Sequence, residues 1–143
     1  MRVYYCDDFV LPLPDAHRFP MEKYALLREH VAVDAARLGA DLFVPEAATD
    51  AELLRVHGQE YVTSVISGAL GADEVRRIGF PWSSELVERS RRSVGGTICC
   101  MRSALEYGVG VNPAGCPHHS FPDHGEGVCA FNDVAVAIRP GQS

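Results

Sequence analysis

The chain has 143 residues, of which 47% are hydrophobic and 22% charged, and its formal net charge is −6. This composition is typical of one soluble globular domain spanning residues 1–143, and the acidic balance argues against a nucleic-acid-binding surface. No run of apolar residues approaches the roughly 18 that are needed to span a bilayer. The N-terminus lacks the apolar core of a signal peptide, and five cysteines without regular spacing are typical of reduced thiols, so we expect a cytoplasmic protein.

The first half of the chain alternates extended and helical patterns. Short apolar and aromatic runs predict strands, and apolar residues at spacings of three and four predict helices. The elements predicted here are a strand over Arg2–Phe9, a helix over Met21–Leu38, an extended segment over Asp41–Pro45, a short helix over Ala51–Val56 after a cap at Thr49 or Asp50, and a helix over Gln59–Leu70.

The longest predicted helix covers Glu85–Tyr107. Gly95 and Gly96 lie inside it, at a cost of roughly 1 kcal/mol each, which a close helix approach or a bend would explain. The helix also carries the basic stretch of the chain, where arginines alternate with glutamates at i,i+4 spacing, and we interpret this stretch as a solvated face. Its arginines are Arg89, Arg91 and Arg92.

The end of the chain adds a strand, a loop and the start of a helix. Val109–Asn112 is predicted to be a strand, and Asn132 or Asp133 is predicted to cap a helix from Val134. This order of strands and helices indicates an α/β fold, in which a parallel sheet is flanked by helices. Sites in such folds collect at the carboxyl ends of strands, and the loop over residues 113–131 leaves such an end.

That loop region concentrates side chains that can do chemistry. Residues 115–133 hold three of the six histidines, two of the five cysteines, three carboxylates and three glycines. An imidazole titrates near neutral pH, so it can move protons or bind a metal. The adjacent pair His118-His119 is the centre of this cluster.

Several readings of the cluster are open from the residues alone. One is a zinc site, but the ligand spacing fits no closed structural site, and adjacent histidines on a strand point to opposite sides unless a turn redirects them. Another is a zinc deaminase, although the downstream Pro-Cys-x-x-Cys of that class is absent. A nucleophilic cysteine is a third, and two histidines simply hydrogen-bonded in a polar loop is a fourth. The side chains concerned are Cys116, His118, His119, His124, Glu126 and Cys129.

The ordered motifs resemble those of the zinc-dependent histone deacetylase and acetylpolyamine amidohydrolase family, in its bacterial-type members. Its tandem-histidine motif, followed by Gly-Phe-Cys and Phe-Asn-Asp, corresponds to Gly115-Cys116-Pro117-His118-His119-Ser120, Gly127-Val128-Cys129 and Phe131-Asn132-Asp133. Upstream segments are also similar, namely His17–Tyr24, Leu53–Tyr61 and Arg77–Trp82. The resemblance implies the N-terminal portion of a single arginase/deacetylase-like α/β domain.

The resemblance also implies roles for individual residues. In the family, zinc polarises the acyl carbonyl and acidifies a bound water, one histidine takes the water proton, and a histidine later protonates the leaving amine. By position, His119 resembles the general base and His118 its electrostatic partner. Gly127 resembles the residue whose carbonyl holds the substrate amide. Val128 stands where the family usually has a phenylalanine that walls the acyl-lysine tunnel, so a wider tunnel is expected.

The family's zinc ligands are an Asp-x-Asp-x-His-type strand end and a later aspartate, and no residue of this chain matches them, so Zn²⁺ is expected only in the complete domain. Two functions therefore stay open. One is a deacetylase that hydrolyses the acetyl or acyl amide of a lysine or polyamine-like amine. The other, which we expect for these 143 residues alone, is a truncated, inactive homologue that self-associates or pairs with a complementary C-terminal chain.

Overall fold

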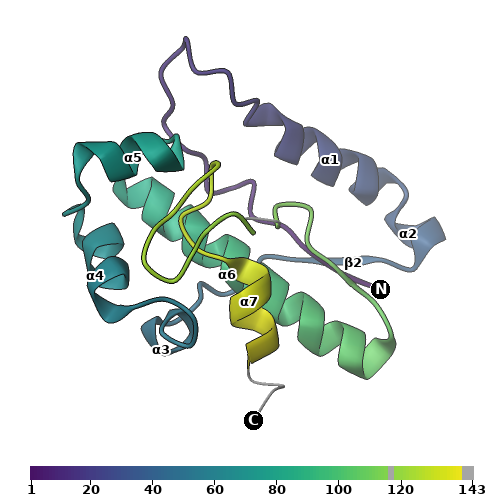
Figure 1. The fold of residues 1–143 in the computed structure, drawn as a ribbon. Coiled ribbons are helices and arrows are strands. Elements are labelled where there is room, and N and C mark those ends of the chain that lie inside the picture. The colour runs from purple at the N-terminus through teal and green to yellow at the C-terminus, as the bar shows by residue number, and fades with distance from the viewer. Residues whose placement is uncertain (116–117, 140–143) are drawn as a thin grey trace.

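Within residues 1–115 and 118–139, which the computed structural model describes, three short strands form a parallel sheet in the order β2-β1-β3 (Figure 1). The strands are β1 (Arg2–Tyr4), β2 (Asp41–Phe43) and β3 (Gly110–Val111). Val3 of the central strand pairs with Leu42 on one side and with Val111 on the other. The predicted α/β fold with a parallel sheet is confirmed.

The first strand is shorter than the prediction of Arg2–Phe9, because the chain turns soon after Tyr5. The backbone N–H of Phe9 donates to the carbonyl of Cys6 at 3.1 Å. The guanidinium of Arg89 donates to two backbone carbonyls of this turn, that of Cys6 at 3.0 Å and that of Phe9 at 2.8 Å. The apolar pattern therefore extends past the end of the strand into a turn.

The helices confirm most of the predicted ones. They are α1 (Glu22–Val33), α2 (Ala35–Leu38), α3 (Asp50–Leu53), α4 (Gln59–Ser67), α5 (Ala72–Ile78), α6 (Ser84–Tyr107) and α7 (Asp133–Ile138). The helix predicted over Met21–Leu38 is divided at Asp34, whose φ of −94° and ψ of 2° leave the helical region. The helix predicted over Gln59–Leu70 ends early, because Gly68 takes a φ of +76°.

Helix α5 was not predicted from the sequence, although its end signals are present. The carboxylate of Glu74 accepts a hydrogen bond from the N–H of Gly71 at 2.7 Å, which caps the start. Gly79 ends the helix with a φ of +87°. Acidic residues lie in the first turn and Arg76 and Arg77 in the last, as the helix dipole favours.

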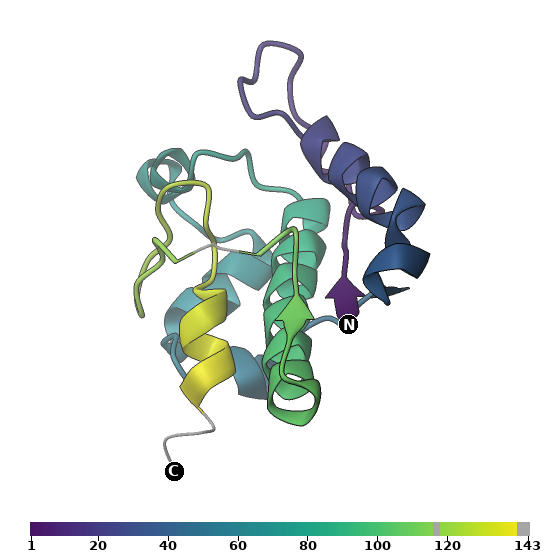
Figure 2. The ribbon, with the colours of Figure 1, turned by 90° about the vertical axis from the view of Figure 1, so that its right-hand side faces the viewer.

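Helix α6 lies at the centre of the molecule. Its first turn is capped by Ser83, whose Oγ accepts from the N–H of Leu86 at 3.0 Å. One side of α6 packs on β1 and β3 and another on α7, and Figure 2 shows α7, α6, β1 and α1 in this order across the molecule. The main core lies where α6 meets α4, α7 and the residues before α7. It contains Ala48, Leu53, Tyr61, Val62, Val65, Val87, Val94, Ile98, Ala130, Phe131, Val136 and Ala137.

Gly95 and Gly96 allow two close approaches to α6. A Cβ on Gly95 would lie 1.9 Å from the carbonyl oxygen of Glu46, and one on Gly96 would lie 2.8 Å from Nδ2 of Asn112. The glycines are therefore explained by close approaches to α6, but the approaching groups differ from the expected helix: they are a connecting segment at Gly95 and an amide side chain at Gly96.

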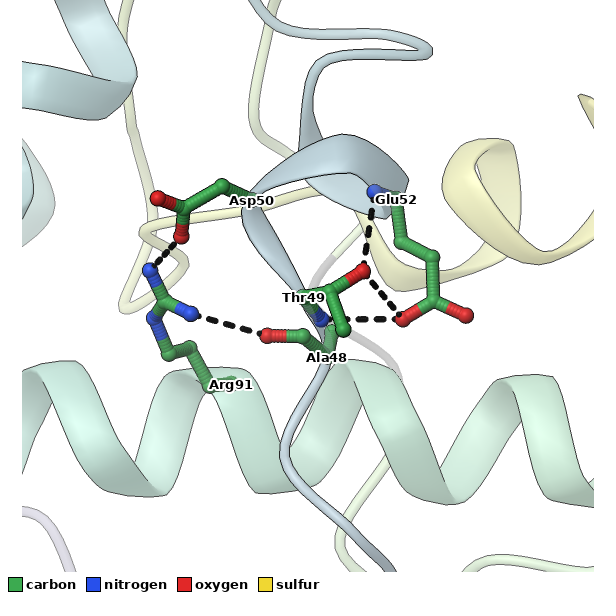
Figure 3. Close-up of polar contacts among 5 residues, drawn as sticks. All are labelled: Ala48, Thr49, Asp50, Glu52 and Arg91. Carbon is green, nitrogen blue, oxygen red and sulfur yellow. Dashed lines mark hydrogen bonds and ion pairs between the residues drawn. The ribbon is translucent and has the colours of Figure 1, made fainter.

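The segment that crosses α6 is tied to it by an arginine. Arg91 donates to the carbonyl of Ala48 at 3.0 Å and pairs with the carboxylate of Asp50 (Figure 3). Next to this contact, Thr49 and Glu52 form a capping box that starts α3, with Thr49 N to Glu52 Oε2 at 2.9 Å and Glu52 N to Thr49 Oγ1 at 3.2 Å.

The interpretation of the basic stretch as a solvated face is wrong for its arginines. Arg89 is 8% exposed and binds the segment between β1 and α1, and its guanidinium also lies 4.5 Å from the ring centre of Tyr24 in α1. Arg92 does pair with Glu88 at 2.7 Å, but it also donates to the carbonyl of Pro45. These side chains bind backbone carbonyls of connecting segments, which the i,i+4 pattern does not reveal.

Candidate active site

The loop between β3 and α7 is closed at its base by a small polar network. Asn112, just after β3, donates from Nδ2 to the carbonyl of Ser93 and to Oγ1 of Thr97, both at 3.0 Å. Thr97 donates in turn to the carboxylate of Asp133 at 2.5 Å. Asp133 is 1% exposed and begins α7. The two ends of the loop are thereby held together over one face of α6.

His118 and His119 are brought together by a turn in this loop. Their ring centres are 4.1 Å apart, with 37° between the ring planes, and both residues are exposed. The turn overcomes the alternation that would point neighbouring side chains of a strand to opposite sides. The amide of Asn132, which also caps α7, donates to the carbonyl of His118 at 3.2 Å and to that of Ser120 at 3.1 Å.

A hairpin places Gly127 against this pair. Glu126 and Cys129 form an antiparallel bridge, so Gly127 and Val128 are the two residues of its turn. Their φ values are +56° and +62°, and positive φ at both positions is the mark of a type I′ turn. A Cβ on Gly127 would lie 3.3 Å from Cγ of His119. The backbone of Gly127 therefore lies so close to the imidazole that a side chain at this position would displace the ring.

The same turn is fixed to the end of α5. The N–H of Gly127 donates to the carbonyl of Arg77 at 3.3 Å, and the N–H of Val128 donates to that of Ile78 at 2.7 Å. The carbonyl of Gly127 accepts a weak hydrogen bond from the thiol of Cys129 at 3.2 Å. Helix α5, which the sequence analysis missed, thus sets the position of both residues predicted to bind substrate.

A cavity of about 240 Å³ lies beside the hairpin. Val128 and Phe131 line it from the loop, and Leu11, Phe19 and Phe80 close it with apolar surface. The guanidinium of Arg89 also reaches its wall. Val128 is 43% exposed, so it both lines this cavity and contacts solvent.

His57 is the site residue that the sequence analysis did not select. It lies between α3 and α4 and is 2% exposed. Its Nδ1 is 2.9 Å from the carbonyl oxygen of Phe121, and its Nε2 accepts from the backbone N–H of Asn132 at 3.0 Å. Burial lowers the pKa of His57, against the opposing effect of the Phe121 and Pro122 backbone. In the sequence, only the similarity of the Val-His-Gly segment to a family motif indicated this histidine.

The remaining candidate side chains are turned to other partners. The ring of His124 binds the carboxylate of Asp123 at 2.7 Å and stacks on Phe121, 4.6 Å between ring centres. Cys129, the candidate nucleophile, is 3% exposed. Cys116, with the Cys116-Pro117 departure from the family pattern, lies outside the described residues.

Zinc does not fit the side chains that the structure places. Among residues 1–115 and 118–139, no group of three histidine, cysteine, aspartate or glutamate side chains is arranged to hold a metal ion. The rings of His118 and His119 face each other, and the carboxylate of Asp123 is bound by His124. In the same part of the chain, no helix is long and apolar enough to cross a membrane.

Comparisons with solved structures show the fold. The crystal structure of an HDAC homolog from Aquifex aeolicus matches 99% of this chain and 41% of its own, with a TM-score of 0.71 and 22% sequence identity. The predicted deacetylase-like fold is thereby confirmed for the part of it that this chain covers.

Sequence comparisons agree. An uncharacterized protein of Picosynechococcus sp. is 42% identical over 137 residues, which are 96% of this chain and 46% of that protein. Histone deacetylase 2 of Arabidopsis thaliana is 31% identical over 86% of this chain and 33% of its own. The acetoin utilization protein AcuC of Bacillus subtilis is 28% identical over 86% of this chain and 34% of its own. The chain thus spans about half the length of the first relative and about a third of the other two.

The family model agrees with these relatives and with the motifs described above. The model of the histone deacetylase domain matches residues 17–143, which include the histidine pair, the Gly127-Val128 turn and His57. The chain therefore belongs to the histone deacetylase domain family.

Proposed function

We propose that this chain supplies the proton-transfer part of a deacetylase that hydrolyses the acyl amide of a lysine or of a polyamine-like amine. The observation that carries the proposal is the pair of facing imidazoles of His118 and His119, 4.1 Å apart and open to solvent, in a member of the histone deacetylase domain family. The name of the Arabidopsis relative, histone deacetylase 2, supports the reaction class.

In this proposal His119 is the general base. It accepts a proton as a water oxygen adds to the acyl carbon. The C–N bond then breaks, a histidine of the pair returns the proton to the amine nitrogen, and the products are a carboxylate and a free amine. The ring of His118 faces that of His119 and stabilises the charge that this ring carries between the two steps.

Gly127 and Val128 are proposed to bind the acyl amide. The carbonyl of Gly127 would accept the amide N–H of the substrate, since its present partner, the Cys129 thiol at 3.2 Å, is a weak donor that an amide can displace. Val128 would form the wall of the acyl channel. Valine is smaller than the phenylalanine usual at this position, so we propose that bulkier acyl groups than acetyl also fit.

We further propose that the zinc of the family is held by polypeptide other than the described residues. Two observations support this: the described side chains offer no suitable ligand group, and the chain spans 46% of the Picosynechococcus relative. Under this proposal residues 1–143 are a portion of one deacetylase domain and do not hydrolyse amides alone. The free thiols of Cys6, Cys99 and Cys100 support a cytoplasmic location.

The test compares the full-length gene product that contains residues 1–143 with residues 1–143 alone. Zinc content and hydrolysis of an acetyl-lysine peptide and an N-acetylated polyamine are measured for both. We expect stoichiometric zinc and turnover of at least one substrate for the full-length product, and neither for residues 1–143. A zinc-loaded full-length product that hydrolyses neither substrate would contradict the proposed deacetylase function. Full turnover by residues 1–143 alone would contradict the proposal that the zinc ligands lie in other polypeptide.

A further inference from the structure

The imidazole of His57 lies at the centre of the contacts that shape the histidine loop. It is 2% exposed and packs against two aromatic rings that also contact each other, with ring-centre distances of 5.8 Å to Tyr61 and 5.4 Å to Phe131. A polar ring in such a position must have its hydrogen bonds satisfied, because leaving one unmade costs roughly 1–3 kcal/mol.

The two ring nitrogens have different partners, which assigns the tautomer. The partner of Nε2 is the backbone N–H of Asn132, which can only donate, so Nε2 carries a lone pair. The partner of Nδ1 is the carbonyl of Phe121, which can only accept, so Nδ1 carries the proton. One imidazole therefore joins the loop just after the histidine pair to Asn132, the residue that caps the next helix.

The contacts continue from His57 to the histidine pair. Asn132, held at its N–H by His57, donates from its side chain to the carbonyls of His118 and Ser120. Beside His57, the N–H of Gly58 donates to the carbonyl of Pro122 at 2.8 Å. The turn between α3 and α4 thus binds the loop at two places after the histidine pair, at residues 121–122 and at Asn132.

We propose that His57 is a positioning residue, whose two hydrogen bonds hold the loop so that His118 and His119 face each other and His119 rests on Gly127. This inference deepens the proposed function and rests on it for its catalytic consequence. His57 itself is buried behind the loop and acts through Asn132 and Phe121.

Only the uncharged ring can make both bonds. A protonated imidazole has two donors, so its Nε2–H would oppose the N–H of Asn132. The titratable side chain against the ring is Tyr61 of α4, which donates to the carbonyl of Ala130 and whose pKa is raised by burial, so it stays neutral. Burial lowers the pKa of His57 in the folded protein below its ordinary value of 6.5. The hydrogen bonds of the uncharged ring therefore stabilise the fold fully above pH 6.5, and this stabilisation is lost as pH falls through the lower folded pKa.

The first test needs no variant. Long-range ¹H–¹⁵N spectra of the full-length protein, labelled at histidine, report which ring nitrogen carries the proton. We expect one histidine at neutral pH with a protonated Nδ1 and an unprotonated Nε2, assigned to His57 by its loss in His57→Gln. A protonated Nε2 on His57 would overturn the proposal, whatever the activity of the protein.

The second test separates positioning from bulk structure. His57→Phe keeps an aromatic ring of similar size and removes both hydrogen bonds, whereas His57→Gln keeps an acceptor for the N–H of Asn132. His30→Gln, at an exposed position of α1, is the matched control. We expect the ring resonances of His118 and His119 to shift in His57→Phe, to shift less in His57→Gln, and to stay in place in His30→Gln.

In the full-length enzyme, His57→Phe is expected to lower kcat by about 10- to 100-fold with little change in KM, and His57→Gln to recover part of the loss. Unmoved His118 and His119 resonances in a folded His57→Phe protein would overturn the proposal. Moved resonances in a protein that shows no deacetylase activity would leave positioning supported and would refute the proposed function alone. If His57→Phe does not fold, the proposal is tested by the tautomer of His57 and by the shift of the His118 and His119 resonances in His57→Gln.

Discussion

The Cα of Gly127 lies so close to the imidazole of His119 that a Cβ on this glycine would be 3.3 Å from Cγ of the ring. Gly127 is also the first residue of a turn that needs positive φ, and its N–H is bound by the carbonyl of Arg77 at the end of α5. The position of His119 therefore depends on a backbone shape that is set by a helix far from it in the sequence.

Gly127→Ala tests this dependence. Alanine at a φ of +56° is strained by about 1 kcal/mol, and its methyl group must push the His119 ring by a few tenths of an ångström. Gly39→Ala is the matched control, because Gly39 has a φ of +59° and open space around its Cα. We expect both variants to unfold at lower denaturant concentration, but only Gly127→Ala to move the ring resonances of His119. Unmoved His119 resonances in Gly127→Ala would show that the contact does not position the ring.

Val128→Asn is expected to stabilise the protein by about 1 kcal/mol, because a β-branched residue is strained at a φ of +62° whereas asparagine tolerates positive φ. Val134→Asn is the control. Val134 is also 43% exposed but lies in α7, where the two residues have similar helix propensity, so we expect a change within about 0.5 kcal/mol. Urea unfolding of both variants checks this, and a loss of stability in Val128→Asn would contradict the assignment of strain.

Gly95→Ala and Gly96→Ala should differ in cost. At Gly95 the new methyl would lie 1.9 Å from the backbone oxygen of Glu46, so the crossing segment must move, and we expect a loss of about 3 kcal/mol or more. At Gly96 it would meet the side chain of Asn112 at 2.8 Å, which can move without a backbone shift but loses hydrogen bonds to Ser93 and Thr97, and we expect a loss of about 1–2 kcal/mol. Equal losses in the free energy of unfolding, measured by denaturant, would contradict the conclusion that the segment around Glu46 is held rigidly against α6.

The capping box of α3 predicts a dependence of stability on pH. Burial of Glu52 opposes its ionisation, but hydrogen bonds from the backbone N–H and hydroxyl of Thr49 outweigh this and lower its pKa from the ordinary 4.5. Because its pKa is lower in the folded protein, ionised Glu52 contributes stability above pH 4.5. This contribution is lost as pH falls through the folded pKa.

Glu52→Gln keeps the cap without this titration. We expect wild type to exceed Glu52→Gln by about 0.5 kcal/mol at pH 6 and to lose this advantage near pH 3. Glu60→Gln, in the exposed first turn of α4, controls for the loss of one charge. An advantage of wild type that persists at pH 3 would show that the charge of Glu52 is not its source.

Particular elements show how far the sequence alone reached. Helix α6 was predicted because the apolar periodicity of Glu85–Tyr107 lies between a serine cap and a glycine. The parallel sheet followed from the order of elements, and the histidine pair from a motif that is local in sequence. Each of these signals can be read without knowing what lies nearby in space.

What was missed depends on contacts between distant segments. The turn after β1 depends on Arg89, some 80 residues away, and the shape of the histidine loop depends on His57, 75 residues before Asn132. The positive φ of Val128 opposes its intrinsic preference and is imposed by the bridge between Glu126 and Cys129 and by the end of α5. No local pattern predicts these contacts.

The most direct test of the proposed chemistry is turnover of an acetyl-lysine peptide by the full-length protein with and without His119. We predict that His119→Ala lowers kcat by about 10²- to 10⁴-fold, the usual range for the loss of a general base or acid. His30→Ala, a histidine exposed on α1, should leave kcat within about threefold of wild type. A His119→Ala protein that turns over at the wild-type rate would contradict the assignment of proton transfer to this pair.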